Sequence, residues 1–92
     1  MVRARVRVRG RVQGVGFRWF VLHHARQLGV KGYVRNCPDG SVEVVVEGEP
    51  AVVERLLELV RLGPPPARVQ AVEVQWETPT GEFADFDVRR TG

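Results

Sequence analysis

The sequence predicts an α+β sandwich in which two helices cover one face of an antiparallel β-sheet. Stretches in which apolar and polar residues alternate suit half-buried strands, and two stretches with helical spacing lie between them. The resulting order is βαββαβ with a short final strand, which is an α+β arrangement. The 92 residues provide enough chain for one modest core, so we expect residues 1–92 to form a single domain.

The first half of the chain is expected to form a strand, a helix and a second strand. In Val2–Val12, valine and alanine alternate with arginine, which predicts a strand with one apolar and one charged face. After a glycine-rich loop, apolar residues recur at helical spacing in Phe17–Leu28, and Gly29 is typical of a helix end. Val30–Asn36 then predicts the second strand.

The middle of the chain is expected to form a turn, a strand and the second helix. Cys37–Gly40 reads as a turn, because proline presets φ and glycine accepts a positive φ. Ser41–Glu47 alternates again and predicts a strand. Pro50 suits the first turn of a helix, whose apolar stripe runs up to Gly63. This stripe consists of Val53, Leu56, Leu57 and Val60.

The end of the chain is expected to return to the sheet. The three prolines after Gly63 cannot continue a helix and predict a stiff connector. Val69–Trp76 predicts a fourth strand, Thr78–Gly81 a turn, and Phe83–Val88 a short last strand. The inward residues of the fourth strand are expected to be Val72, Val74 and Trp76.

Composition excludes several classes of protein. No apolar run approaches the roughly 18 residues of a membrane span, and the N-terminus lacks the apolar core of a secretory signal. Cys37 is the only cysteine, which fits a reducing cytoplasm. His23 and His24 point about 100° apart on a helix, so we expect no metal site there, with His24 buried and His23 at the surface. A chain this small can act as a monomer. Its preference for arginine resembles the composition of thermostable proteins, and a GC-rich genome is the alternative explanation of this usage.

The two parts of the chain carry opposite charge. Residues 1–38 hold nine cations and no acid, and residues 39–92 hold five cations and eleven acids, so the parts are +9 and −6. Either a bound polyanion or pairing within the molecule accounts for this asymmetry. RNA-recognition modules share the topology but stack bases on aromatic residues, and the outward positions of the first and third strands carry none. These positions are Arg3, Arg5, Arg7, Arg9, Ser41, Glu43, Val45 and Glu47. Pairing with acids across the sheet, Glu73 and Glu77 included, is therefore preferred, with RNA binding as the alternative.

The loop between the first strand and the first helix raises a question about Arg18. A cation at the start of a helix faces the positive end of the helix dipole, which is unfavourable. A glycine-rich loop at a helix N-terminus also forms an anion site, and the guanidinium matches a phosphate in two-point hydrogen bonds. In this interpretation, Arg18 is tolerated at the helix start because an anion binds between its guanidinium and the loop amides. The alternative is an ordinary turn with a solvated Arg18.

Asn36 is the second unusual residue, because asparagine is depleted in strands and this one ends a strand. It can form the following turn through its own backbone, or its amide can orient a reacting molecule. Its distance from the loop cannot be derived from the spacing. No Asp, Glu or His lies near the loop except Asp39, so such a site suits a leaving group that needs no protonation. Acyl phosphates qualify, because they release a carboxylate whose acid has a pKa of about 4.

Two motifs carry a resemblance to a known family. VRGRVQGVGFR, which is Val8–Arg18, and GYVRNCPDGSVEVVVEG, which is Gly32–Gly48, resemble the two signature motifs of the acylphosphatases. The length and the element order agree, so the resemblance covers essentially the whole chain. It implies a ferredoxin-like fold and a hydrolase of the carboxyl–phosphate bond that uses no metal, no cofactor and no covalent phosphoenzyme.

The resemblance also implies the site residues and the partners. Arg18 would be the catalytic arginine that holds the phosphoryl group, and Asn36 would position the attacking water. The backbone amides of the phosphate cradle would come from Gly14, Val15, Gly16 and Phe17. The expected partners are an acyl phosphate substrate and inorganic phosphate as product and inhibitor, with no membrane and no nucleic acid. The same domain begins much longer hydrogenase-maturation carbamoyltransferases, but we expect the free-standing enzyme. The final Arg89–Gly92 departs from the aromatic ending that is common in the family.

Overall fold

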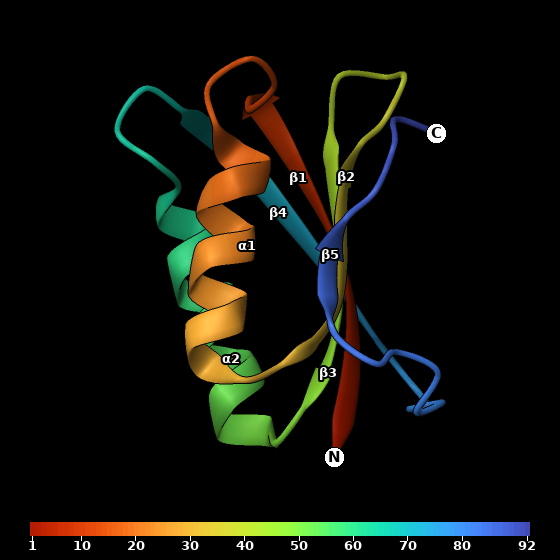
Figure 1. The fold of residues 1–92 in the computed structure, drawn as a ribbon. Coiled ribbons are helices and arrows are strands. Elements are labelled where there is room, and N and C mark those ends of the chain that lie inside the picture. Colours follow the sequence, from red (N-terminus) through yellow and green to blue (C-terminus); the bar gives the residue numbers. More distant parts are fainter.

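A computed structural model describes residues 1–92 and contains the two predicted helices and a five-stranded sheet (Figure 1). The elements that were predicted before the last strand begin and end within two residues of the expected positions. In chain order they are β1 (Val2–Arg11), α1 (Phe17–Leu28), β2 (Lys31–Asn36), β3 (Val42–Gly48), α2 (Pro50–Leu62), β4 (Arg68–Glu77) and β5 (Phe86–Val88).

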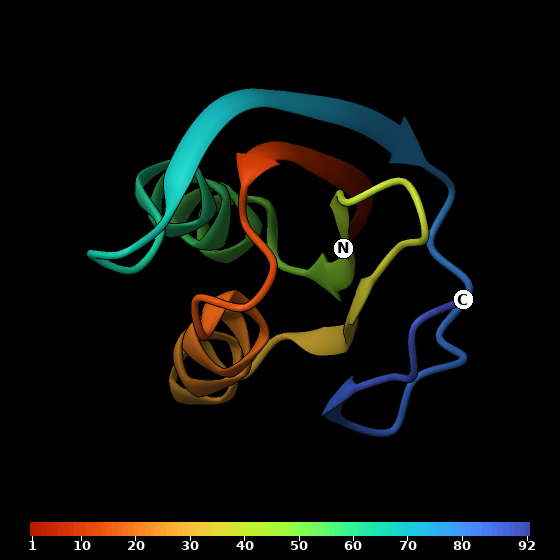
Figure 2. The ribbon, with the colours of Figure 1, turned by 90° about the horizontal axis from the view of Figure 1, so that it is seen from above.

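The sheet has the strand order β4-β1-β3-β2-β5, and both helices cover the same face of it (Figures 1 and 2). β1 pairs antiparallel with β3 and β4, and β3 pairs antiparallel with β2. β1 and β2 therefore run in the same direction on either side of β3. As a result their carboxyl ends lie at one end of the sheet, where α1 also begins (Figure 1).

The core lies between the sheet and the two helices. α2 buries its whole predicted stripe, and α1 buries Phe17, Val21 and Ala25. Both helices end at a glycine with positive φ. At Gly29 (φ 72°) the backbone N–H donates to the carbonyls of the last turn of α1, which satisfies groups that a helix end would otherwise leave free. These packed faces hold the start of α1 in a fixed position over the sheet.

The last strand differs from the prediction. β5 spans only Phe86–Val88 and pairs in parallel with β2, so the sheet is antiparallel in its first four strands but not at this edge. The reason lies in the path of the chain. β4 ends at the opposite edge and at the end where β2 begins, and residues 78–85 cross the face away from the helices before β5 starts (Figure 2). A strand that starts beside the start of β2 must run parallel to it.

Trp76 lies on the predicted side of the sheet, but it is not buried in the core. Trp76 pairs with the buried Ala4 and therefore belongs to the helix side of the sheet, but the residue is 52% exposed. β4 is an edge strand, and its apolar residues Val72 and Val74 are only partly buried against the core. The helices do not reach far enough to cover the end of β4.

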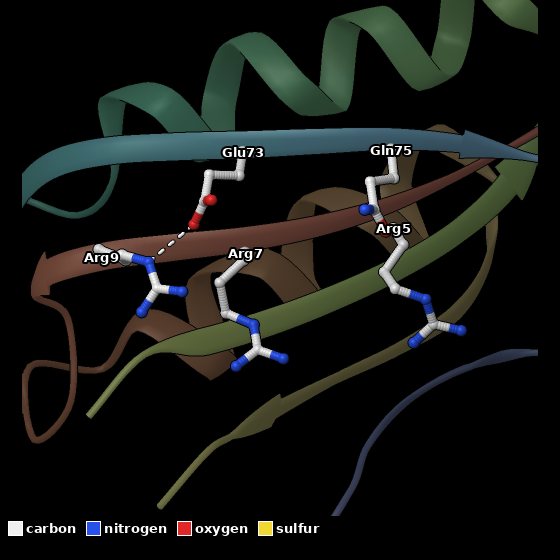
Figure 3. A pocket seen from close by; sticks show the side chains of 5 residues that line it. All are labelled: Arg5, Arg7, Arg9, Glu73 and Gln75. Carbon is white, nitrogen blue, oxygen red and sulfur yellow. Dashed lines mark hydrogen bonds and ion pairs between the residues drawn. The ribbon is translucent and has the colours of Figure 1, made fainter. Parts of the chain in front are cut away.

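The arginines of β1 pair within the molecule, as expected. Arg3 Nη1 lies 2.8 Å from Glu47 Oε2, and Arg9 Nε lies 2.7 Å from Glu73 Oε1 (Figure 3). Arg5 contacts both Glu43 and Glu77 at 3.0–3.1 Å. A hollow of about 250 Å³ lies over this face between Arg5, Arg7, Arg9, Glu73 and Gln75 (Figure 3). The pairing explains how this charge is balanced without a polyanion.

The same face is more buried than a solvated charged face would be. Arg3, Ser41, Glu43, Val45 and Glu47 are all buried. Part of the cover comes from the crossing segment: the ring of Phe83 packs 5.2 Å from the Arg3 guanidinium and 5.9 Å from the ring of Tyr33. Burial of the outer face therefore depends on residues far from it in the sequence.

Glu47 joins the crossing segment to the sheet, and we expect its replacement to destabilise the fold. Its carboxylate accepts hydrogen bonds from Arg3 Nη1 (2.8 Å) and from the N–H groups of Thr80 (2.9 Å) and Gly81 (3.0 Å). Burial alone would raise its pKa, but these donors lower the pKa from 4.5 to about 2. The folded state thus gains stability from this carboxylate above about pH 4.5 and loses it as the pH falls toward 2.

We expect Glu47→Gln to lower the free energy of unfolding at pH 7 by about 3 kcal/mol, because it breaks a buried ion pair. Urea unfolding at pH 7 and at pH 2 measures this difference, which should shrink at pH 2, where the native carboxylate is also becoming protonated. Glu58→Gln, at an exposed ion pair with Arg55, is the matched control and should have an effect below 1 kcal/mol. A loss that is equal at both pH values would contradict the role of the charge.

Candidate active site

Both strand ends and the start of α1 border one small cavity. It encloses about 100 Å³ and is lined by Val12, Gly14, Gly16, Phe17, Arg18, Trp19 and Asn36. Arg18 comes from the first turn of α1 and Asn36 from the last position of β2. They meet because β1 and β2 run in the same direction and end at the same edge (Figure 1). The sheet topology thus supplies the proximity that the spacing alone could not predict.

The loop has the backbone geometry of an anion site. Gly14 (φ 72°) and Gly16 (φ 79°) are left-handed, and a Cβ at either position would meet no atom within 4 Å. Glycine is therefore required there for conformation and not for space. The first backbone bond of α1 runs from the Phe20 N–H to the Gly16 carbonyl, and no side chain caps the helix. The N–H groups that precede Phe20 in α1 have no acceptor within the helix, which favours a negative ligand.

Arg18 is free to act on such a ligand. Its side chain is half-buried and makes no hydrogen bond or ion pair with any other residue, whereas all four outward arginines of β1 are paired with carboxylates. The first turn of α1 holds no acidic residue either. An unpaired guanidinium against the positive end of a helix is unfavourable on its own, and a bound anion removes this cost.

Asn36 has an unused amide oxygen. Its Oδ1 is the one buried side-chain polar atom of the chain that has no hydrogen-bond partner. The alternative role, closing the following turn, is performed by other groups. The Gly40 N–H donates to the Cys37 carbonyl (3.1 Å), and the Ser41 N–H donates to Asp39 Oδ1 (2.9 Å). A buried acceptor without a partner normally has a functional reason.

Gln13, for which no role was predicted, connects the two segments that border the cavity. Its Nε2 donates to the carbonyl of Cys37 (2.8 Å) and to that of Ser41 (2.9 Å). These two bonds join the loop that precedes Arg18 to the turn that follows Asn36. The only sign of this role in the sequence is that Gln13 is an uncharged polar residue directly before Gly14.

We expect Gln13→Ala to lower kcat for an acyl phosphate roughly tenfold, because the two halves of the site lose their connection and a small misplacement of reacting groups is costly. Two lost hydrogen bonds also reduce stability by about 2 kcal/mol. Steady-state kinetics and urea unfolding measure the two effects. Gln70→Ala, at an exposed glutamine of β4 that borders neither the cavity nor any other hollow, is the control. Unchanged kcat with reduced stability would show that Gln13 only supports the fold.

The structure also describes the other residues that were singled out from the sequence. Val15 is not among the lining residues, and its side chain packs partly against the core. Cys37 is buried and has a free thiol. His23 is exposed and His24 is partly buried, and the pKa of His24 is lowered by this burial and by the nearby His23 and Arg55. No group of three or more His, Cys, Asp or Glu side chains is placed to hold a metal ion. None of the helices is both long and apolar enough to span a membrane.

The chain is similar to known proteins over nearly its whole length. The acylphosphatase family model matches residues 4–88. An acylphosphatase of Thermococcus kodakarensis is 60% identical over 80 residues, covering 87% of this chain and 88% of that protein. One of Anaeromyxobacter dehalogenans is 54% identical over 88 residues, covering 96% and 95%. The crystal structure of acylphosphatase from Bacillus subtilis gives a TM-score of 0.93 at 35% identity and covers 97% of this chain and 99% of its own. These similarities extend over nearly the whole of each chain.

Proposed function

The chain belongs to the acylphosphatase family and hydrolyses the carboxyl–phosphate bond of acyl phosphates, and on this premise we propose a role for each group in the cavity. Arg18 and the backbone amides of Gly14–Phe17 hold the phosphoryl group, and Asn36 positions the attacking water. One observation carries this proposal: an unpaired guanidinium, a turn of free N–H groups and an unpartnered amide oxygen line the same small cavity.

The chemistry follows from what each group can donate or accept. The N–H groups and the guanidinium are donors aimed at the phosphoryl oxygens, where negative charge is held in the transition state. Asn36 Oδ1 accepts a hydrogen bond from the water and so directs its lone pair at phosphorus. The leaving carboxylate needs no proton at neutral pH, because its acid has a pKa of about 4. The site therefore requires no general acid.

Isotope labelling tests where the water attacks. Hydrolysis of benzoyl phosphate in ¹⁸O-labelled water, with a chelator present, should place the label in the released phosphate and none in the benzoate. This result is expected because the donors surround the phosphoryl group, so that the P–O bond breaks. Label in the benzoate would mean attack at the acyl carbon and would overturn the assignment of Asn36 and the loop.

Further properties are part of the same proposal. Inorganic phosphate is expected to inhibit as a product, since it fits the same donors. The single buried free thiol suits a reducing compartment, so we place the enzyme in the cytoplasm.

The ion pairs over the outer sheet face, which link several strands, favour thermostability. One hydrophobic cluster serves the whole chain, and the exposed large apolar residues are scattered, which favours a single-domain monomer. These residues are Met1, Trp19, Leu62 and Trp76.

A further inference from the structure

Trp19 lies where two hollows of the surface meet. It lines the small cavity together with Arg18 and Asn36, and it also lines a larger and more open hollow on the outer side of α1. The second hollow measures about 500 Å³ and is bordered by Trp19, Leu22, His23, Arg26 and Gln27. Trp19 is 62% exposed, which is unusual for a residue with so large an apolar side chain. The position beside the reacting groups requires an explanation.

The small cavity can hold only one end of a substrate. Its volume of about 100 Å³ is well below the roughly 300 Å³ at the lower end of pockets that enclose a whole drug-sized ligand. The donors around the cavity suit the phosphoryl group and offer nothing to an acyl group. The acyl group of any substrate larger than an acetyl group must therefore extend out of the cavity along its wall.

The outer side of α1 provides a continuous path for such a group. Residues 19, 22, 23, 26 and 27 follow the i, i+3, i+4, i+7, i+8 spacing of one helix face. Trp19 is at the cavity end, and Leu22 follows one turn later. Further along, the Arg26 guanidinium donates to the Phe86 carbonyl (3.2 Å) and to Asp87 Oδ1 (3.5 Å), both of β5. The hollow therefore has an apolar start and a polar far end.

We infer that this hollow is the acyl subsite of the enzyme and that Trp19 determines its specificity by stacking on flat, apolar acyl groups such as aryl groups. The inference rests on the proposed function, because it needs the phosphoryl group to lie at Arg18. The hollow is continuous with the small cavity, because Trp19 borders both. An acyl group attached to the bound phosphoryl group is therefore a better occupant than a protein partner. An aromatic face packs on another ring with a favourable energy beyond the area that it buries.

The test compares two substrates that share the phosphoryl group. For Trp19→Ala, we expect kcat/KM for benzoyl phosphate to fall about tenfold. The loss for acetyl phosphate should be at least fivefold smaller, because an acetyl group is too short to stack. Trp19→Phe should restore most of the benzoyl preference. Trp76→Ala removes the other tryptophan, which is also exposed but lies on β4, and should leave the ratio of the two kcat/KM values unchanged.

Two outcomes would overturn the inference. Equal losses for both substrates in Trp19→Ala would show that the ring supports the loop and does not contact the acyl group. No loss for either would show that the acyl group leaves the cavity by another path. Failure of the proposed function itself is recognised separately: Arg18→Ala would then retain competitive inhibition by inorganic phosphate in the same assay.

A binding measurement supports the kinetic one. In Trp76→Phe, Trp19 is the only tryptophan, so the fluorescence reports on the two hollows that Trp19 borders. Titration with benzoylphosphonate, whose P–C bond resists hydrolysis, should change the fluorescence with a midpoint equal to its inhibition constant. Inorganic phosphate should give less than half of this change, because it fills only the small cavity. Equal changes with both ligands would place the benzoyl group away from Trp19.

Discussion

Replacing Arg18 by lysine is expected to lower kcat/KM for benzoyl phosphate on the order of 10³-fold, and replacing it by alanine at least as much. Loss of one preorganised donor to a developing charge costs roughly 10²–10³-fold, and Arg18 supplies two donors from a planar group that an ammonium cannot imitate. Competitive inhibition by inorganic phosphate should weaken together with activity, because the same group binds the ground state. Steady-state kinetics with phosphate as inhibitor measures both effects.

The fold is expected to survive this change, since Arg18 makes no ion pair or hydrogen bond within the protein. Thermal unfolding of Arg18→Ala should match the wild type or show a small gain, because a cation is removed from the positive end of α1. Arg11→Lys is the matched control, as Arg11 is exposed and does not line the cavity. Near-normal turnover in Arg18→Lys would show that a point charge suffices and that two-point binding is not the mechanism.

Replacing Asn36 by alanine is expected to separate turnover from binding. We expect kcat to fall on the order of 10²-fold or more, which is the scale at which misplacing a reacting group is felt. Affinity for inorganic phosphate should change little, because the water is positioned mainly in the transition state and phosphate is held by other groups. The expected pair of results is a low kcat and an unchanged inhibition constant, measured by kinetics and by calorimetry.

The stability of Asn36→Ala decides between the two roles considered for this residue. Its side chain makes no hydrogen bond in the following turn, so the melting temperature should not fall by more than a few degrees. A variant that is stable, binds phosphate and is inactive supports the positioning of water. A variant that is destabilised but active at low temperature would show that Asn36 only shapes the turn.

Much of the fold could be predicted because its signals are local. The stripe of α2, the proline at its start and the glycine after its end lie within 14 residues, and each acts through the backbone of its own neighbourhood. The exposure of Trp76 and the burial of Glu47 were not predictable in this way. Both depend on which strand lies at the edge and on where residues 78–85 cross, which are long-range properties of the chain.

The site shows the same division. Arg18 could be singled out from the sequence, since a cation at a helix start beside a glycine loop conflicts with the helix dipole. The meeting of Arg18 with Asn36 could not, because it requires β1 and β2 to run in the same direction on either side of β3. The contribution of Gln13 was hidden for a similar reason. Its acceptors are carbonyl groups 24 and 28 residues away, and carbonyl groups leave no trace in a sequence.

The buried thiol of Cys37 gives access to motions of the site. It is the only cysteine of the chain, and its carbonyl is held by Gln13 at the junction of the loop and the turn. A thiol reagent can reach the sulfur only after this junction opens, so the rate of alkylation under native conditions reports the free energy of local opening. The alkylation rate of this one native thiol can thus compare how strongly different bound anions suppress the opening of this junction.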